Sequence, residues 1–172
     1  MCYLASQNKM CLDYQCSLYS SWDPNLSHSA LISTMLLLCF PSSNLYLMIV
    51  RYMLPGKEKY SKQKTKVVRK NNNPEWNQAI IYRDIILNSL NEIGIEISVW
   101  NYDRFSSNDF LGGCRINCGS RMFFDYHVFT DLIKNNQPWL DAMNAEKSAW
   151  LAMCERPSIW IEATIQLRSS LN

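Results

Sequence analysis

Residues 95–113 read IEISVWNYDRFSSNDFLGG, and this stretch decides the class of fold. Its first half alternates apolar Ile95, Ile97 and Val99 with other side chains, as in a strand that buries one face. A polar loop follows at 101–109, and the next run is again rich in apolar residues. The stretch therefore predicts two strands joined by a polar loop.

Strand signals of the same kind recur on both sides of this stretch, separated by turn residues or by changes of pattern. They cover residues 45–54, 65–70, 79–82, 110–116 and 161–168. Apolar side chains at helical spacing over 140–155 predict one late helix, which Pro157 ends. Strands and helices do not alternate as they would in a doubly wound enzyme. We therefore expect an all-β fold, an antiparallel β-sandwich with a helix before the last strand.

The composition is that of a globular chain with one domain. Hydrophobic residues make up 48% of the 172 residues and charged residues 19%, which argues against disorder. The seven cysteines form no CxxC pair and there are two histidines, so we expect free thiols in a reducing compartment and no zinc site. The apolar runs at 31–40 and 45–50 are each shorter than the roughly 20 residues of a membrane-spanning helix. We expect buried strands or core there.

Residues 1–44 differ from the rest of the chain. They contain four of the seven cysteines and many serines, without a sustained strand or helix period. We therefore divide the chain into a divergent or poorly structured segment, 1–44, and a folded domain, 45–172. The first strands of the sandwich are not identified, which leaves open whether they are missing or replaced.

The segment from 57 to 70 concentrates positive charge. It holds seven basic residues and one acid, whereas the rest of the chain holds ten basic and fourteen acidic residues. The basic residues are Lys57, Lys59, Lys62, Lys64, Lys66, Arg69 and Lys70. Lys62, Lys64 and Lys66 occupy every second position, so on a strand their ammonium groups share one face, about 6.5–7 Å apart. Lys70 continues the same period.

Such a row of cations can meet several phosphate groups at once. The alternative is a solvated edge strand that its lysines protect from aggregation. Nucleic acid is not an expected partner, because its sequence-tolerant binding needs aromatic side chains between the basic ones, and Tyr60 and Trp76 only flank the segment. No GxSxG, P-loop or HExxH motif is present, so we expect no catalytic set and no enzyme.

The loop at 101–109 raises the question of calcium, because it carries clustered oxygen ligands. Calcium takes about 6–8 oxygen ligands, mostly carboxylates. An EF-hand would need a glycine and a glutamate at the positions of Ser106 and Gly112, so this loop is not an EF-hand. Asp103 and Asp109 could still supply ligands if another loop brought further carboxylates close.

Taken together, these motifs resemble a C2 domain, and more closely the second C2 domain of the synaptotagmin-like proteins. The run YMLPGKEKYSKQKTKVVRKNNNPEWNQAIIY at 52–82 resembles the family's strand, polybasic strand and NPxΦN block. Residues 95–113 resemble its strand and third top loop, and 139–171 resemble its helix, last strand and LRSS-type tail. The resemblance covers residues 50–172.

The resemblance implies an eight-stranded antiparallel Greek-key sandwich of the synaptotagmin type. It also implies binding to anionic phospholipids, particularly phosphoinositides, in vesicle docking, exocytosis or membrane trafficking. The chain would then be cytoplasmic and peripheral on the plasma membrane or on secretory vesicles. Family members also carry a Rab-binding domain that these residues do not contain, so Rab GTPase binding is not carried over.

The chain departs from calcium-binding members of the family at two places. Asn101 stands where the third loop has its first aspartate, and only Asp103 and Asp109 match. The residues SSNLYLMIVR before Tyr52 contain no acid, where the other calcium loop has two aspartates. Two carboxylates neither fill the coordination shell nor balance the charge of a calcium ion. We therefore expect a vestigial site with no metal and no cofactor.

We predict a calcium-independent, non-enzymatic membrane-binding module. Lys62, Lys64 and Lys66 would bind phosphoinositide headgroups, and the other four cations of the segment would add long-range attraction. Arg104 and Phe105 would lie at a membrane-facing loop tip. Two alternatives stay open: a protein-interaction module whose basic strand binds an acidic docking protein, and the targeting domain of a lipid-modifying enzyme.

Overall fold

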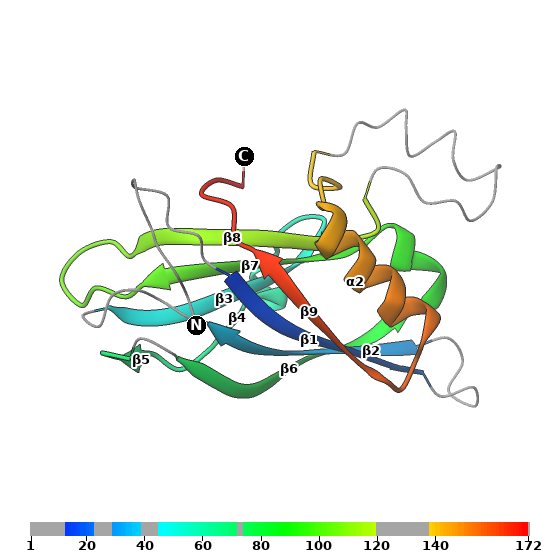
Figure 1. Cartoon of the computed structure of the whole chain (residues 1–172). Helices are drawn as coiled ribbons and strands as arrows, with labels where there is room; N and C mark the ends of the chain where they lie inside the picture. Colours follow the sequence, from blue (N-terminus) through cyan, green and yellow to red (C-terminus); the bar gives the residue numbers. More distant parts are fainter. Residues whose placement is uncertain (1–12, 23–28, 39–44, 72–73, 120–137, 172) are drawn as a thin grey trace.

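The structure, a computed structural model, describes residues 13–22, 29–38, 45–71, 74–119 and 138–171. Two antiparallel β-sheets form the two layers of a sandwich, and one α-helix lies beside them (Figure 1). In the described part of the chain, no helix is long and apolar enough to span a membrane.

The first sheet has four strands in the order β6-β2-β1-β9, and all neighbours are antiparallel. Its strands are β1 (Asp13–Trp22), β2 (Ser29–Leu38), β6 (Glu75–Ile86) and β9 (Trp160–Gln166). The two strands from the N-terminal part of the chain therefore lie inside this sheet, between β6 and β9.

The second sheet has the order β4-β3-β7-β8, and β5 also pairs with β3. Its strands are β3 (Tyr46–Leu54), β4 (Gln63–Lys64), β5 (Val68–Arg69), β7 (Gly94–Asn101) and β8 (Asp109–Asn117). β4 and β5 follow one another along the same edge of β3, so they form one interrupted strand. With that pair counted once, the described residues form eight strands, four in each sheet.

The hydrophobic core lies between the sheets and takes side chains from both. Ile95, Ile97 and Val99 of β7 point into it and have no exposed surface, as their alternation predicts. Glu96 and Ser98 point to the opposite face of the second sheet, which is called the outer face below. Burial of each such apolar side chain contributes about 1.5–3 kcal/mol.

Helix α2 (Asn144–Glu155) packs against β8 and β9. Ala149, Trp150 and Met153 lie at helical spacing and are buried in the core. The Trp150 Nε1 also donates a hydrogen bond to the Leu90 carbonyl at 3.2 Å. Two short 3₁₀ helices complete the described elements, η1 (Lys59–Ser61) and η2 (Leu87–Asn91).

The predicted β-sandwich with a helix before its last strand is confirmed. The structure adds to this expectation: β1 and β2 supply first strands of the sandwich, which the sequence left open as missing or replaced. They are hydrogen-bonded to β9 and β6, so the division between 1–44 and 45–172 is not a division between sheets. The apolar run at 31–40, expected to be buried strand or core, largely coincides with β2. Its place in the sandwich was not identified, because SALISTMLLL places apolar residues at consecutive positions and so hides the strand period.

After β9 the C-terminal tail, residues 167–171, crosses from the first sheet to the second. The backbones of Arg168 and Gly113 of β8 exchange two hydrogen bonds, at 2.8 and 2.9 Å. A Cβ at position 113 would lie 2.6 Å from Leu171 Cδ1 and 2.7 Å from the Ile97 carbonyl oxygen. The tail can lie this close to β8 because position 113 has no side chain.

Gly113→Ala should therefore displace the tail and destabilise the fold. The added methyl group meets a backbone oxygen of a central strand, so we expect a loss of about 1–3 kcal/mol in the free energy of unfolding. Urea denaturation measures this loss. Ser148→Ala, on an exposed position of α2, is the control and should stay within about 0.5 kcal/mol of the parent. An unchanged urea midpoint for Gly113→Ala would contradict the close approach of the tail.

Candidate anion-binding surface

The basic segment runs antiparallel along the edge of β3. Lys64 pairs with Val50 in this register. Thr65 makes two hydrogen bonds with Ile49, the residue opposite it in β3. The Thr65 N–H donates to the Ile49 carbonyl, and the Thr65 Oγ1 accepts from the Ile49 N–H, both at 3.0 Å. Because Thr65 is buried, its neighbours in the segment turn toward solvent.

A bulge at 66–67 interrupts this edge strand, since these two residues lie opposite the single residue Met48. Beyond the bulge, Arg69 pairs with Tyr46. The predicted period of two therefore does not extend to Lys70, whose φ of 48° lies outside the extended range. Arg69, rather than Lys70, projects to the same face as Lys64.

The row of cations projects from the outer face of the second sheet. Cross-strand partners project to the same side, and the ring contacts agree with this register. The Lys62 Nζ lies 5.2 Å from the centre of the Tyr52 ring, and the Arg69 Cζ lies 5.8 Å from that of Tyr46. Lys62, Lys64 and Arg69 are called the basic face below.

All seven basic residues predicted as lipid contacts in this segment are exposed. Lys57 differs from the other six because it is in an ion pair. Gly56 and Lys57 have positive φ angles of 102° and 43° in the turn that follows β3. The Lys57 Nζ lies 2.7 Å from Glu96 Oε1, and the side chain remains 46% exposed. The Glu96 carboxylate therefore offsets part of the Lys57 charge.

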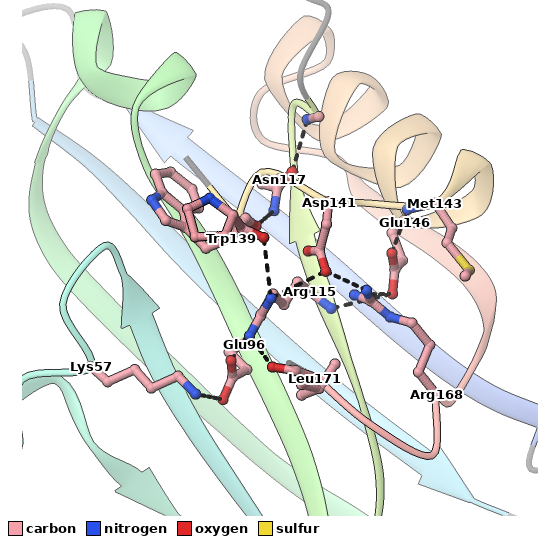
Figure 2. Close-up of polar contacts among 12 residues, drawn as sticks. Lys57, Glu96, Arg115, Asn117, Trp139, Asp141, Met143, Glu146, Arg168 and Leu171 are labelled. Atoms are coloured by element: carbon pink, nitrogen blue, oxygen red, sulfur yellow. Dashed lines mark hydrogen bonds and ion pairs between the residues drawn. The ribbon is translucent and has the colours of Figure 1, made fainter. Parts of the chain in front are cut away.

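A buried ion-pair network lies behind this lysine (Figure 2). The Arg115 Nε donates to Glu96 Oε2 at 3.0 Å, and its Nη1 donates to Asp141 Oδ2 at 3.1 Å. The Arg115 Nη2 bonds the Leu171 carbonyl of the tail. Asp141 also accepts from Arg168 Nη1, at 2.6 Å. The network therefore joins β7 and β8 to the tail and to the segment that precedes α2.

Glu146 closes the network in the first turn of α2, where it is 1% exposed. Its carboxylate accepts from the Met143 N–H at 2.5 Å, from the Arg115 N–H at 3.2 Å and from Arg168 Nη2 at 3.3 Å. Burial raises the pKa of Glu146, and these donors act against that rise. The network was not predicted, because Glu96 and Arg115 read as solvent-facing strand residues and the tail that covers them comes from a distant part of the sequence.

An open cavity of about 380 Å³ lies on the outer face beside Lys57. Its walls are the rings of Tyr52, Trp100 and Phe110, and the tail closes one side through 169–171. The Trp100 and Phe110 rings meet edge to face, with centroids 5.2 Å apart. Since Tyr52 also carries a cation of the basic face, the cavity and the basic face are continuous.

The loop at 101–109 is held by its own polar side chains. The Asp103 carboxylate accepts from the Phe105 N–H at 2.7 Å, from the Ser106 N–H at 3.2 Å and from the Ser106 hydroxyl at 2.7 Å. These bonds, the Phe105 N–H first, lower the pKa of Asp103. Arg104 and Phe105 are exposed in this loop: the Phe105 side chain is 93% exposed, and the Arg104 Cζ lies 5.9 Å from its ring centre. Their contact with a membrane stays a prediction.

Asn101 stands at the first aspartate position of the loop, and both of its polar atoms are engaged. Its Oδ1 accepts from the Tyr46 N–H at 3.0 Å, and its Nδ2 donates to Asp109 Oδ2 at 3.4 Å. A hydrogen-bond donor therefore faces the carboxylate where calcium would need another oxygen. Within the described ranges, no three His, Cys, Asp or Glu side chains come together as a metal site requires.

Comparison with known proteins identifies sequence relatives of this chain. A sequence model described as the C2 domain matches residues 34–136. Human protein piccolo is 43% identical over 117 residues, which are 63% of this chain and 2% of piccolo. Mouse synaptotagmin-like protein 2 is 33% identical over 119 residues, which are 69% of this chain and 12% of that protein. The chain thus spans a small part of these relatives.

Solved structures resemble the chain in fold. The crystal structure of the RIM C2A domain from Drosophila has a TM-score of 0.51 and 24% identity, over 61% of this chain and 86% of that one. The solution structure of the third C2 domain of KIAA1228 protein has a TM-score of 0.52 and 17% identity, over 67% of this chain and 82% of that one. Both matches support the sandwich architecture.

Calcium at about 1 mM, the upper range for weak protein sites, should leave the melting temperature of the chain unchanged. The Asn101 amide already occupies the place of the missing carboxylate, and the Asp103 oxygens are bonded within the loop. Differential scanning fluorimetry with calcium against EGTA measures the effect. Asn101→Asp is the matched variant: it should melt lower than the parent, because its carboxylate faces Asp109. Calcium should restore only part of this loss, because the residues before Tyr52 supply no further carboxylate. A calcium-induced rise in the parent would overturn the vestigial assignment.

Proposed function

This chain belongs to the C2 domain family, and we propose that it is a non-enzymatic module that binds anionic phospholipids, phosphoinositides above all, in vesicle docking or exocytosis. The resemblance to C2 domains is confirmed, and synaptotagmin-like proteins are among the relatives. The correspondence to the second C2 domain of that family stays a prediction. The site of action would be the cytoplasmic face of the plasma membrane or of secretory vesicles.

The arrangement of charge on the basic segment is the observation that carries this proposal. Six of its seven cations have no acidic partner among the residues that the structure describes; Lys57 is the exception. Lys62, Lys64 and Arg69 also share one face, so a planar anionic surface can meet them together. Each would contribute about 1 kcal/mol near an anionic membrane, within a Debye length of about 10 Å.

The loop tip supports the same orientation toward a membrane. The Tyr102 N–H donates to the Tyr46 carbonyl at 2.6 Å, and Tyr46 pairs with Arg69. The loop and one end of the basic face therefore lie at the same end of the second sheet (Figure 1). Insertion of the Phe105 ring into the interfacial layer would add about 1.5–3 kcal/mol, while Arg104 stays among the headgroups.

Binding would be independent of calcium, because hydrogen bonds within the protein hold the loop in place without a bound cation. Asn101 ties it to β3, and Asp103 caps its tip through bonds to Phe105 and Ser106. An acidic docking protein could use the same cations. This alternative, a protein-interaction module, would be favoured if the chain bound an acidic protein at low salt, lost it at high salt, and did not bind vesicles.

Replacing Lys62, Lys64 and Lys66 together by Gln should weaken binding to phosphatidylcholine vesicles that contain phosphatidylinositol bisphosphate. The loss should be on the order of 100-fold, because about 1 kcal/mol is lost per lysine. Co-sedimentation measures the affinity. Lys147→Gln with Arg156→Gln, on and just after α2, is a control that removes charge elsewhere and should have a much smaller effect. Parent-like affinity of the triple variant would refute the assignment of these lysines.

Phe105→Ala should lower vesicle affinity on the order of tenfold, since a benzyl group no longer inserts. This loss should persist at high ionic strength, whereas the loss caused by the lysine substitutions should shrink there. Ile159→Ala, which truncates an exposed apolar side chain before β9, is the control and should bind like the parent. Equal affinities for the Phe105→Ala and Ile159→Ala variants would remove the loop tip from the membrane contact.

A further inference from the structure

The tail presents two serine hydroxyls to the cavity on the outer face. Ser169 and Ser170 are exposed and line the cavity, and neither hydroxyl makes a hydrogen bond within the part of the chain that the structure describes. Ser98 also lines it but differs: its hydroxyl is buried, donates to the Val50 carbonyl and accepts from Trp100 Nε1. The two tail hydroxyls are therefore the ones open to modification there.

These serines are held in place from both sides. On one side, Arg168 is fixed by its backbone bonds to Gly113 and by its guanidinium bonds to Asp141 and Glu146. On the other side, the Leu171 carbonyl is bonded by Arg115. A group added to either hydroxyl would consequently remain at the cavity wall.

The charges around the cavity suit an anion at this wall. Lys57 lines it and keeps much of its side chain exposed, and Lys62 lies over the Tyr52 ring at its rim. Glu96 is the opposing carboxylate, and Arg115 already compensates its charge at 3.0 Å. A phosphoserine carries a charge near −1.5 to −2 (roughly, at neutral pH) and accepts charge-assisted hydrogen bonds from lysine.

We propose that Ser169 and Ser170 form a phosphorylation site whose phosphate pairs with Lys57 and closes the cavity to anionic headgroups. A protein kinase supplies the phosphoryl group from ATP: the serine oxygen forms the new P–O bond, the bond to ADP breaks, and the hydroxyl proton leaves to the kinase base. The added charge cancels part of the basic face, so modification weakens membrane binding. This regulatory effect rests on the proposed function, whereas the pairing with Lys57 does not.

A double-mutant cycle tests the pairing without any lipid. Phosphoserine is placed at 169 or at 170 by genetic code expansion, in the parent and in Lys57→Gln, and the four melting temperatures are compared with those of the unmodified chains. Lys57→Gln should lower the melting temperature more in at least one phosphorylated chain than in the unmodified one. Equal losses at both positions would overturn the pairing.

Vesicle co-sedimentation tests the regulatory effect. The phosphorylated chain should bind phosphatidylinositol-bisphosphate vesicles on the order of tenfold more weakly than the unmodified chain. Phosphoserine at position 148, on an exposed part of α2, is the matched control and should bind more nearly like the parent. If phosphoserine in the tail and at position 148 lowered vesicle affinity equally, net charge alone would explain the loss, and the proposed regulatory site would be wrong. Failure of the unmodified chain to bind would instead refute the proposed function.

Mass spectrometry of the chain expressed in animal cells tests whether the site is used. Phosphate on a peptide that includes 169–170, removed by phosphatase treatment and absent from the Ser169→Ala, Ser170→Ala double variant, is the expected result. Complete peptide coverage without phosphate at either serine, in cells treated with phosphatase inhibitors, would overturn the assignment.

Discussion

The hydrogen-bond register between β3 and the basic segment determines where the cations of the basic face point. Strand side chains alternate between faces, so a slip by one residue would turn Lys62 and Lys64 toward the core. An unpaired ammonium group there would be strongly unfavourable. The two hydrogen bonds between Thr65 and Ile49 hold the register, and the bulge at 66–67 then restores the outward direction for Arg69. The outward direction of the basic face is thus a consequence of strand pairing.

The opposite part of the outer face is organised by buried charge. Glu96 and Arg115 are desolvated there because the tail and the segment before α2 cover them. Such pairs add little net stability, but loss of one partner costs about 3–5 kcal/mol, so they hold the tail in one position. Lys57 extends the same network to the surface. The outer face therefore has a closed half, an open basic half, and a cavity where they meet.

The sequence predicted the parts of this fold that depend on local period. Ile95, Ile97 and Val99 identified β7, and the loop after them was placed correctly with its exposed Phe105. Three features depend on pairings between distant residues and could not be read locally. The bulge at 66–67 appears only when the segment is aligned with β3. The tail crossing pairs Gly113 with Arg168, far along the chain. The apolar run at 31–40 was expected to be buried strand or core, but its position between β1 and β6 depends on pairing that the run itself does not reveal.

The loop and the basic face lie at one end of the same sheet, and Asn101 orders that loop without a metal. Both features support the proposal that this surface binds an anionic membrane without calcium. Photocrosslinking with a photoreactive phosphatidylinositol bisphosphate in vesicles, followed by peptide mapping in calcium-free buffer, examines this contact directly. We expect crosslinks in residues 57–70 and around 101–109, with none in α2. Crosslinks confined to α2 or β9, or crosslinks at the loop that require calcium, would contradict it.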